Sequence, residues 1–208
     1  MDSLVTASGV LDFTATGGQG GKMLPQDYGF FTASRTLGAP PAMPQAAVDA
    51  GWTEIIAPFA SASPCWRIYW GKFLAPGDTD PLPAETSARK RLRFIRGARV
   101  KAGSPVMLVS ATAVTAGHIP AATPVVPVRR ELGFLDLYCR AAQASLDGYL
   151  PAGSTRRYVA ANSVNNEIGA SSRDASGVLG AGWAAFDPTF TAATVYAALS
   201  LIFEPRNS

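Results

Sequence analysis

The residues best suited to chemistry in this sequence are cations, and they are concentrated in one short segment. Residues Arg89–Lys101 hold seven basic side chains in thirteen positions and no acid: Arg89, Lys90, Arg91, Arg93, Arg96, Arg99 and Lys101. The rest of the chain has eleven basic and fifteen acidic residues, a net charge of minus four, so the positive excess of the protein lies in this segment. Arginine offers paired N–H donors to phosphate and carboxylate groups, and each neutralised phosphate releases counterions. The segment therefore predicts a surface that binds a polyanion without reading its sequence.

The same segment alternates as a β-strand does. One parity carries Leu92, Phe94, Arg96, Ala98 and Val100, and the other carries Arg91, Arg93, Ile95, Gly97, Arg99 and Lys101. Because successive side chains of a strand point to opposite faces, the second set would form a ladder of cations along one surface. Two other interpretations stay open: the arginines pair with acids elsewhere on the fold or on a neighbouring subunit, or they protect a sheet edge against aggregation.

Groups for catalysis or metal binding are sparse. His118 is the only histidine and no G-x-S-x-G sequence is present, so neither a histidine metal cluster nor a serine-hydrolase nucleophile elbow is available. Asp78 and Asp80 could bind calcium, but a D-x-D sequence in a Pro-Gly loop is more typical of turn hydrogen bonds. Thr16–Met23 lacks the first glycine and the final Ser or Thr of a phosphate-binding loop, and we interpret it as a glycine hinge. We expect no cofactor, no metal and no enzymatic activity.

The tryptophans allow one further binding hypothesis. Cys65–Phe73 alternates Trp66, Ile68 and Trp70 with Arg67, Tyr69 and Gly71. Two tryptophans on the same face as an isoleucine indicate a packed core. A platform for carbohydrate would instead require a row of exposed rings from Trp52, Trp66, Trp70, Trp183 and Tyr69.

Strands dominate the elements that must position these side chains. Aromatic and β-branched runs bounded by turn residues predict strands over Val5–Phe13, Glu54–Phe59, Cys65–Phe73, Leu92–Val100, Val106–Ala113 and Thr194–Phe203. The connection Ala102–Pro105 suits a hairpin between the fourth and fifth of these strands. Apolar residues at helical spacing favour a short helix within Glu131–Leu146, although a strand is also compatible with that segment. Ala160–Ala184 predicts a long loop with at most one weak strand.

These elements predict one mainly β domain that carries an arm. Residues 1–50 contain Gly-rich and Pro-rich stretches and predict an extended N-terminal arm with one short strand, and residues 51–208 predict a single β domain. A chain of 208 residues buries enough surface to support its own core. Strands at short intervals with few helices favour an antiparallel sandwich or a jelly-roll-like barrel with one short helix.

The composition of the chain indicates the compartment in which we expect the protein and the partners that we expect it to have. Apolar residues make up 48% of the chain and charged residues 16%, against roughly 25% charged residues in an ordinary soluble domain. Because a weakly charged surface favours association, we expect a homo-oligomer. Cys65 and Cys139 are the only cysteines and Met1–Val5 does not have the character of a secretory signal, so we expect two buried free thiols in a reducing cytoplasm. The longest apolar stretch, Ala192–Phe203, is too short for a membrane helix, and we expect no membrane contact.

In its Gly/Pro-rich arm, β core, low charge and basic strand, the chain resembles structural proteins of virus and bacteriophage particles, such as coat, cement and decoration subunits. The resemblance implies a non-enzymatic virion subunit, made in the host cytoplasm, that self-assembles and contacts other virion subunits. It also implies that the arm lies across neighbours and that basic side chains face nucleic acid or an acidic partner. The alternatives are a carbohydrate- or ligand-binding β module, which requires exposed aromatic rings, and an enzyme, which requires an acid–base pair.

Overall fold

The computed structural model describes side chains and backbone over residues 9–14, 23–35, 38–58, 60 and 66–94. It describes the backbone alone for residues 2–6, 59, 61, 65 and 95 and for the five strands between residues 107 and 203. The chain divides into two compact units, Met1–Ala98 and Arg99–Ser208, a division that differs from the one expected at residue 50. Each unit contains one five-stranded antiparallel sheet.

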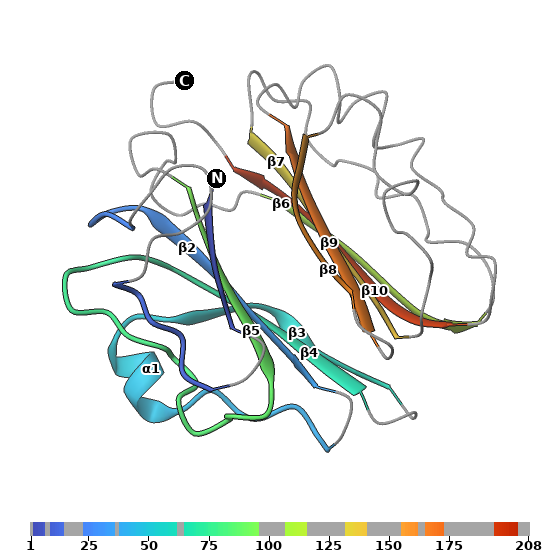
Figure 1. Ribbon diagram of the computed structural model, residues 1–208, viewed down its shortest axis with the longest axis horizontal. Helices are drawn as coiled ribbons and strands as arrows, with labels where there is room; N and C mark the ends of the chain where they lie inside the picture. The colour runs from blue at the N-terminus through green and yellow to red at the C-terminus, as the bar shows by residue number, and fades with distance from the viewer. Residues whose placement is uncertain are drawn as a thin grey trace. The chain divides into compact units, whose positions relative to one another are not determined.

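The described part of the chain is mainly β, which confirms the expected fold class at that level (Figure 1). The first unit holds β1 (Asp2–Thr6), β2 (Tyr28–Arg35), α1 (Gln45–Asp49), β3 (Thr53–Ser61), β4 (Cys65–Phe73) and β5 (Arg89–Ile95). The second unit holds β6 (Met107–Thr115), β7 (Leu132–Arg140), β8 (Thr155–Ala161), β9 (Asn165–Ser172) and β10 (Thr194–Phe203). The strands predicted over Cys65–Phe73 and Thr194–Phe203 coincide with β4 and β10.

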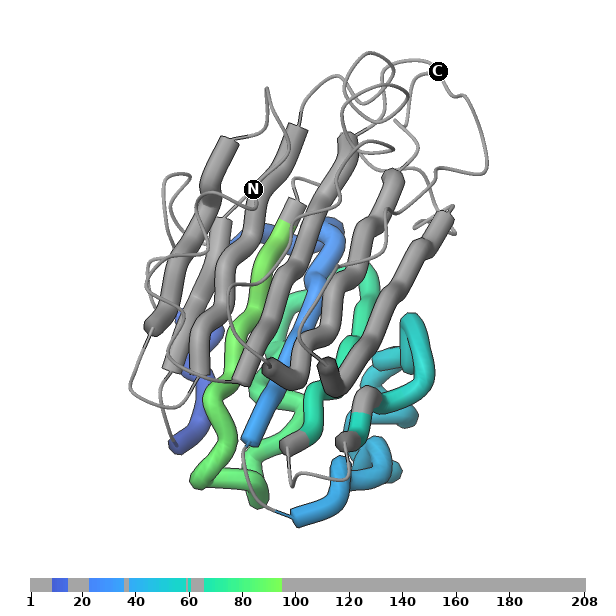
Figure 2. The backbone as a smooth tube through the Cα atoms, turned by 90° about the vertical axis from the view of Figure 1, so that its right-hand side faces the viewer, coloured from blue at the N-terminus to red at the C-terminus, as the bar shows by residue number. Residues whose placement is uncertain are grey.

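The strands of the first sheet follow the order β1-β5-β2-β4-β3. Figure 2 shows β5, in green, beside β2, in blue, and β2 pairs with β4 along its other side. The segment expected to be an extended arm therefore supplies the central strand of this sheet. It does so because the aromatic run Tyr28–Phe31 fits a pleated surface, and because Gly29 leaves room for Leu74, which a Cβ would approach to 2.7 Å.

One face of this sheet carries the hydrophobic core of the unit. The strands contribute Phe31, Ala33, Trp66, Ile68, Trp70, Leu92 and Phe94. The helix and the connecting segments cover them with Leu11, Phe13, Ala47, Trp52, Leu74, Leu82 and Ala88. Phe31 stacks on Trp70 with ring centroids 5.5 Å apart and meets Trp52 edge to face at 6.0 Å. The core interpretation of Trp66 and Trp70 is confirmed; Trp183 lies outside the described residues.

Residues 9–14 pack against this core and do not continue β1. Leu11 and Phe13 are buried, the Gly9 amide donates to Thr86 O at 2.7 Å, and the Leu11 amide donates to Asp80 Oδ2 at 2.9 Å. Gly9 has a positive φ of 90°, a conformation that ends an extended run. The strand predicted over Val5–Phe13 is consequently shorter and lies nearer the N-terminus, as β1.

The second sheet follows the order β6-β10-β7-β9-β8 and corrects the prediction of a helix within Glu131–Leu146. Leu132–Arg140 is the middle strand of this sheet, with β10 on one side and β9 on the other. Apolar residues occupy both parities of this run, as they do in strands at the centre of a sheet, so the run fits a helical period equally well.

The hairpin predicted between Leu92–Val100 and Val106–Ala113 is also wrong. β5 pairs with β1 and β2, whereas β6 pairs with β10, so the two strands belong to different sheets. Turn residues indicate that two strands are close in sequence, but the pairing depends on partners far along the chain. Ala102–Pro105 itself lies outside the described residues.

Among the residues that the structure describes, no helix is long and apolar enough to span a membrane.

Candidate binding face

The basic residues of β5 divide between the two faces of the first sheet. Lys90 lies on the core face with Leu92, and Arg91 and Arg93 lie on the opposite face. The alternation predicted for Arg91–Phe94 is thus confirmed. Arg96, Arg99 and Lys101 lie outside the described residues, so the ladder is observed only in part.

Two neighbouring strands extend this basic face. In the register of the sheet, Arg93 pairs with Phe30, Arg91 with Thr32, and Arg89 with Ser34 of β2. On the other side of β2, Thr32 pairs with Tyr69 and Ser34 with Arg67 of β4. We call this surface the arginine face: Arg67, Arg89, Arg91 and Arg93 with Phe30, Thr32, Ser34 and Tyr69.

Aromatic rings lie between the guanidinium groups of the arginine face. Arg93 Cζ lies 4.5 Å from the centroid of the Phe30 ring, and Arg67 Cζ lies 5.3 Å from that of Tyr69. Phe30 and Tyr69 stack on one another with centroids 6.1 Å apart and an interplanar angle of 18°. Arg93 Nη2 also donates to Thr32 Oγ1 at 3.1 Å. Cation–π contacts of this kind stabilise by about 2 kcal/mol when desolvated, so the face is a connected cation–aromatic network.

Tyr28 is the first residue of β2 and lies on the same side of the strand as Phe30, two positions further on. Tyr28 meets Phe73 edge to face with centroids 5.2 Å apart. Desolvation by burial raises the pKa of the Tyr28 phenol well above its usual range. The folded protein therefore keeps this phenol neutral to a higher pH than an exposed tyrosine would be.

The arginine face is shielded from solvent. Arg67, Arg91 and Arg93 are 1%, 2% and 1% exposed, and Arg89 is half-buried with its Nη1 atom shielded. Contact of Arg67, Arg91 or Arg93 with a phosphate would require these side chains to be uncovered. Protection of a sheet edge is also excluded for these residues, because β5 lies between β1 and β2. Binding of a polyanion or a partner by Arg89, Lys90, Arg91, Arg93, Arg96, Arg99 and Lys101 stays a prediction.

A buried guanidinium requires polar or ring contacts inside a protein, because desolvation costs several kcal/mol per ion. Neither β2, β4 nor β5 contains an Asp or Glu. Any carboxylate that offsets the arginine face therefore comes from outside these three strands. This arrangement fits the interpretation in which the arginines contact a protein partner or another part of the fold.

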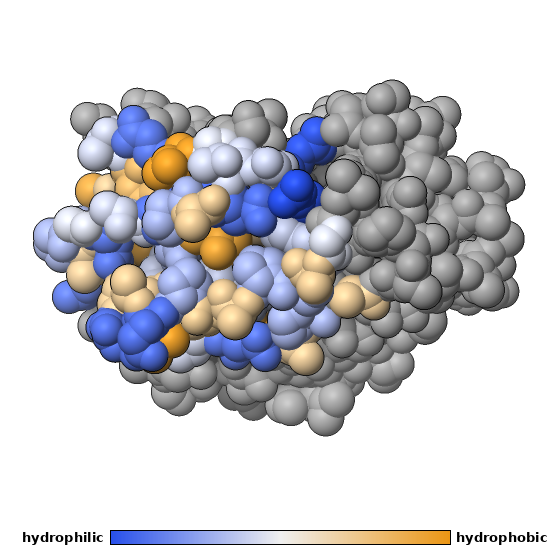
Figure 3. All heavy atoms as spheres, turned by 90° about the horizontal axis from the view of Figure 1, so that it is seen from below, coloured by the Kyte–Doolittle hydropathy of each residue, from blue (hydrophilic) through white to orange (hydrophobic). Residues whose placement is uncertain are grey.

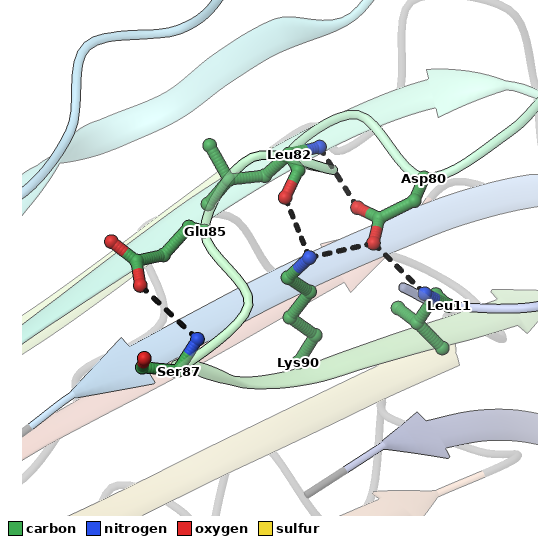
Figure 4. A network of polar contacts seen from close by, with 6 residues as sticks. All are labelled: Leu11, Asp80, Leu82, Glu85, Ser87 and Lys90. Atoms are coloured by element: carbon green, nitrogen blue, oxygen red, sulfur yellow. Dashed lines mark hydrogen bonds and ion pairs between the residues drawn. The ribbon is translucent and has the colours of Figure 1, made fainter. Parts of the chain in front are cut away.

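Lys90 belongs to a separate network on the core face (Figure 4). Its Nζ donates to Asp80 Oδ2 at 2.7 Å and to Leu82 O at 2.5 Å. The same carboxylate accepts the Leu11 amide through Oδ2 and the Leu82 amide through Oδ1. Both charged side chains are 0% exposed. The pair joins β5, the 80–82 loop and the segment 9–14.

The D-x-D residues are engaged in turns and ion pairs, as their loop context predicts. Asp78 Oδ1 accepts Lys72 Nζ at 2.6 Å, and its Oδ2 accepts the Ala75 amide at 2.6 Å. Lys72 Nζ also donates to Ala50 O, at the C-terminal end of α1. Among the described residues no cluster of His, Cys, Asp or Glu could hold a metal ion, and His118 lies outside them.

The described outer surface is mixed in character. Figure 3 shows hydrophilic and hydrophobic residues interspersed on one face of the molecule. The exposed large hydrophobic side chains are Val10, Leu24 and Val48, which come from three different segments. Within the described ranges, these single positions define no apolar docking surface.

The alternation of β4 predicts that Arg67 and Tyr69 share one face of the strand. It does not predict that this face continues the face of Arg91 and Arg93. The alternation of Arg67 and Tyr69 is visible in Cys65–Phe73, whereas the order β5-β2-β4 that brings the two segments together has no local sequence signal.

A comparison with known protein families, curated proteins and solved structures finds no match to this chain.

Proposed function

We propose that this chain is a non-enzymatic structural subunit of a virus particle, in the role of a coat, cement or decoration protein, and that it assembles with copies of itself. It would be made in the host cytoplasm and reside in the virion. Its partners would be further copies and other virion subunits. The fold that we propose is an antiparallel sandwich or jelly-roll-like barrel.

The observation that carries this proposal is that, among the strands that the structure describes, both sheets are open. Each five-stranded sheet ends in two edge strands, β1 and β3 in the first unit and β6 and β8 in the second. Edge strands present backbone N–H and C=O groups that pair with another chain, and subunits built from sheets use this for assembly. The low fraction of charged residues, 16%, supports the same conclusion, because few like charges oppose contact between copies.

In this proposal the described N-terminal segments do not serve as an arm that reaches a neighbouring subunit. An extended arm that reaches a neighbour was expected within residues 1–50. β1 pairs with β5, the segment 9–14 packs on the core and β2 is central to the sheet, so these parts are engaged within their own unit. We therefore assign assembly to sheet edges and not to exchange of these segments.

The arginine face has a structural role in this account. Its buried cation–aromatic contacts stabilise the first sheet and hold the side chains of β2, β4 and β5 in place. We assign nucleic-acid contact, where it occurs, to the basic residues that follow β5: Arg96, Arg99 and Lys101. Such contact would be non-specific, because it depends on phosphates alone.

Electron microscopy of the purified full-length chain at high concentration tests this function. The expected images contain regular particles or lattices whose repeating unit comprises several chains. A field of isolated particles of single-chain size, under all solution conditions that keep the protein folded, would contradict the proposal.

A further inference from the structure

Three of the four sheet edges carry features that oppose pairing with another chain. β1 is only five residues long. β3 contains Pro58 and two register shifts against β4. β8 contains Arg156 and Arg157 and one register shift against β9. Short length, proline, bulges and charge are the devices that protect natural sheet edges from unwanted pairing.

β6 has none of these protections. It spans nine residues, Met107–Thr115, with the sequence MLVSATAVT, which holds no charged residue, no proline and no glycine. Its pairing with β10 runs through nine consecutive positions without a register shift. Among the strands that the structure describes, β6 pairs with β10 alone. A long, regular and uncharged edge is the kind that accepts a further strand.

The strand that best fits this edge is the same strand of a second copy. The edges β1, β3 and β8 are short, bulged or charged, so none of them matches nine regular residues. The segment 9–14 and β2 are engaged inside their own unit. Pairing of β6 with β6 needs no second surface, and a contact that uses the same patch on both subunits closes as a two-fold dimer.

We propose that two copies of the chain pair antiparallel through their β6 strands, which joins their five-stranded sheets into one continuous sheet. This inference rests on the proposed function and names the surface through which its first assembly step occurs. The register that pairs all nine residues places Ala111 opposite Ala111 of the second copy. No like charges face one another in this register, because β6 carries no charge.

A disulfide cross-link tests this register. We would introduce Ala111→Cys into the full-length chain with Cys65→Ser and Cys139→Ser, and use Val159→Cys in the same background as the control at the β8 edge. Directly opposite residues of antiparallel strands have Cα atoms about 4.5–5.5 Å apart, which suits a disulfide. With an added oxidant, the Ala111→Cys chain is expected to form a covalent dimer and the control is not. No dimer from Ala111→Cys, or equal dimer from both, overturns the proposal.

A charge substitution separates this inference from the proposed function. Ala111→Lys places two ammonium groups opposite one another in the paired register and is expected to weaken self-association by about tenfold or more. Val159→Lys, at the already charged β8 edge, is expected to leave the mass in solution unchanged, and circular dichroism checks that both variants fold. If the wild type and both variants assemble to the same extent, the β6 pairing is overturned but the proposed function is not. A wild-type chain that stays single at every concentration overturns both.

Discussion

On the two faces of β5, cations are stabilised in different ways. On the core face, the buried Lys90 ammonium meets the Asp80 carboxylate at 2.7 Å, and both groups have further backbone partners. On the arginine face, Arg93 lies over the Phe30 ring and donates to the Thr32 hydroxyl. The first arrangement depends on charge pairing, and the second depends on planar stacking as well as hydrogen bonding.

Removing one partner of the Lys90–Asp80 pair is predicted to destabilise the fold strongly. Lys90→Met leaves the Asp80 carboxylate buried without its counter-charge, and such changes cost about 3–5 kcal/mol. Chemical denaturation measures the loss in the free energy of unfolding. Arg35→Met is the matched control, because the Arg35–Glu85 pair at 3.2 Å is partly exposed and should contribute about 0–1 kcal/mol. Equal losses in the two variants would contradict this account.

The buried phenol of Tyr28 is expected to make the folded protein less stable at alkaline pH. Burial raises the pKa of its phenol, so the folded protein keeps the group neutral at a pH where the unfolded chain ionises it. The stability from this group is therefore fully present below about pH 10 and falls as the pH rises further, by up to about 1.4 kcal/mol per pH unit. Urea denaturation across this pH range measures the slope. Tyr28→Phe should reduce it, and an unchanged slope in that variant would refute the assignment.

At the residue scale, much could be predicted from alternation alone. The alternation of side chains along a strand predicts that Leu92 and Phe94 lie in the core and that Arg91 and Arg93 lie on the opposite face. It did not reveal that Lys90 pairs with Asp80, because that contact depends on the path of the 80–82 loop over the core face. Nor did it reveal the burial of the arginines, because single-strand patterns identify two faces without showing what covers each.

Among the elements, β4 depends on one position without a side chain. A Cβ added at Gly71 would overlap the hydroxyl of Tyr28 and approach Ile55 Cδ1 to 2.9 Å. Gly71→Ala is therefore predicted to destabilise the first unit by about 1–3 kcal/mol, the usual cost of overpacking. Thermal unfolding followed by circular dichroism measures the shift.

A matched variant shows whether steric overlap causes the loss at Gly71. Gly77→Ala changes a glycine with open space around it but a positive φ of 86°, so its cost comes from backbone conformation alone. Combining Gly71→Ala with Tyr28→Phe should recover part of the stability, whereas the combination with Gly77→Ala should not. Failure of Tyr28→Phe to recover any stability would refute the steric explanation.

The elements themselves were predictable where runs are short, aromatic and bounded by turns, as in β4 and β10. The sequence of β7 favours a short helix but leaves a strand open, because its apolar residues fit both periods. β2 was overlooked because its strand character rests on the four residues Tyr28–Phe31 among Gly- and Pro-rich neighbours. Both strands lie in the interior of their sheets, where pairing on two sides outweighs local preference.

At the scale of the whole molecule, the burial of the arginine face predicts how the protein responds to nucleic acid. Arg91→Ser with Arg93→Ser should leave the affinity for single-stranded DNA and its salt dependence unchanged, because these side chains do not reach phosphates. A contact with phosphate would lower the salt slope by about one per arginine removed. A salt titration of binding makes the comparison, with circular dichroism to verify folding; a reduced slope would contradict the structural role.

The division into two units and the pairing order of the strands were beyond sequence reasoning. The Gly/Pro-rich stretches suggested a boundary near residue 50, but the boundary lies between Ala98 and Arg99, because β1 and β2 flank β5 in one sheet. Local composition reports where a chain turns, whereas unit boundaries follow from which strands pair across long sequence separations.

The mass of the protein in solution is the most direct test of the proposal that copies of this chain assemble with one another. Sedimentation equilibrium of the full-length chain over a wide range of concentrations should give masses that rise to multiples of the 21.7 kDa chain. A mass of 21.7 kDa at every concentration would contradict the account.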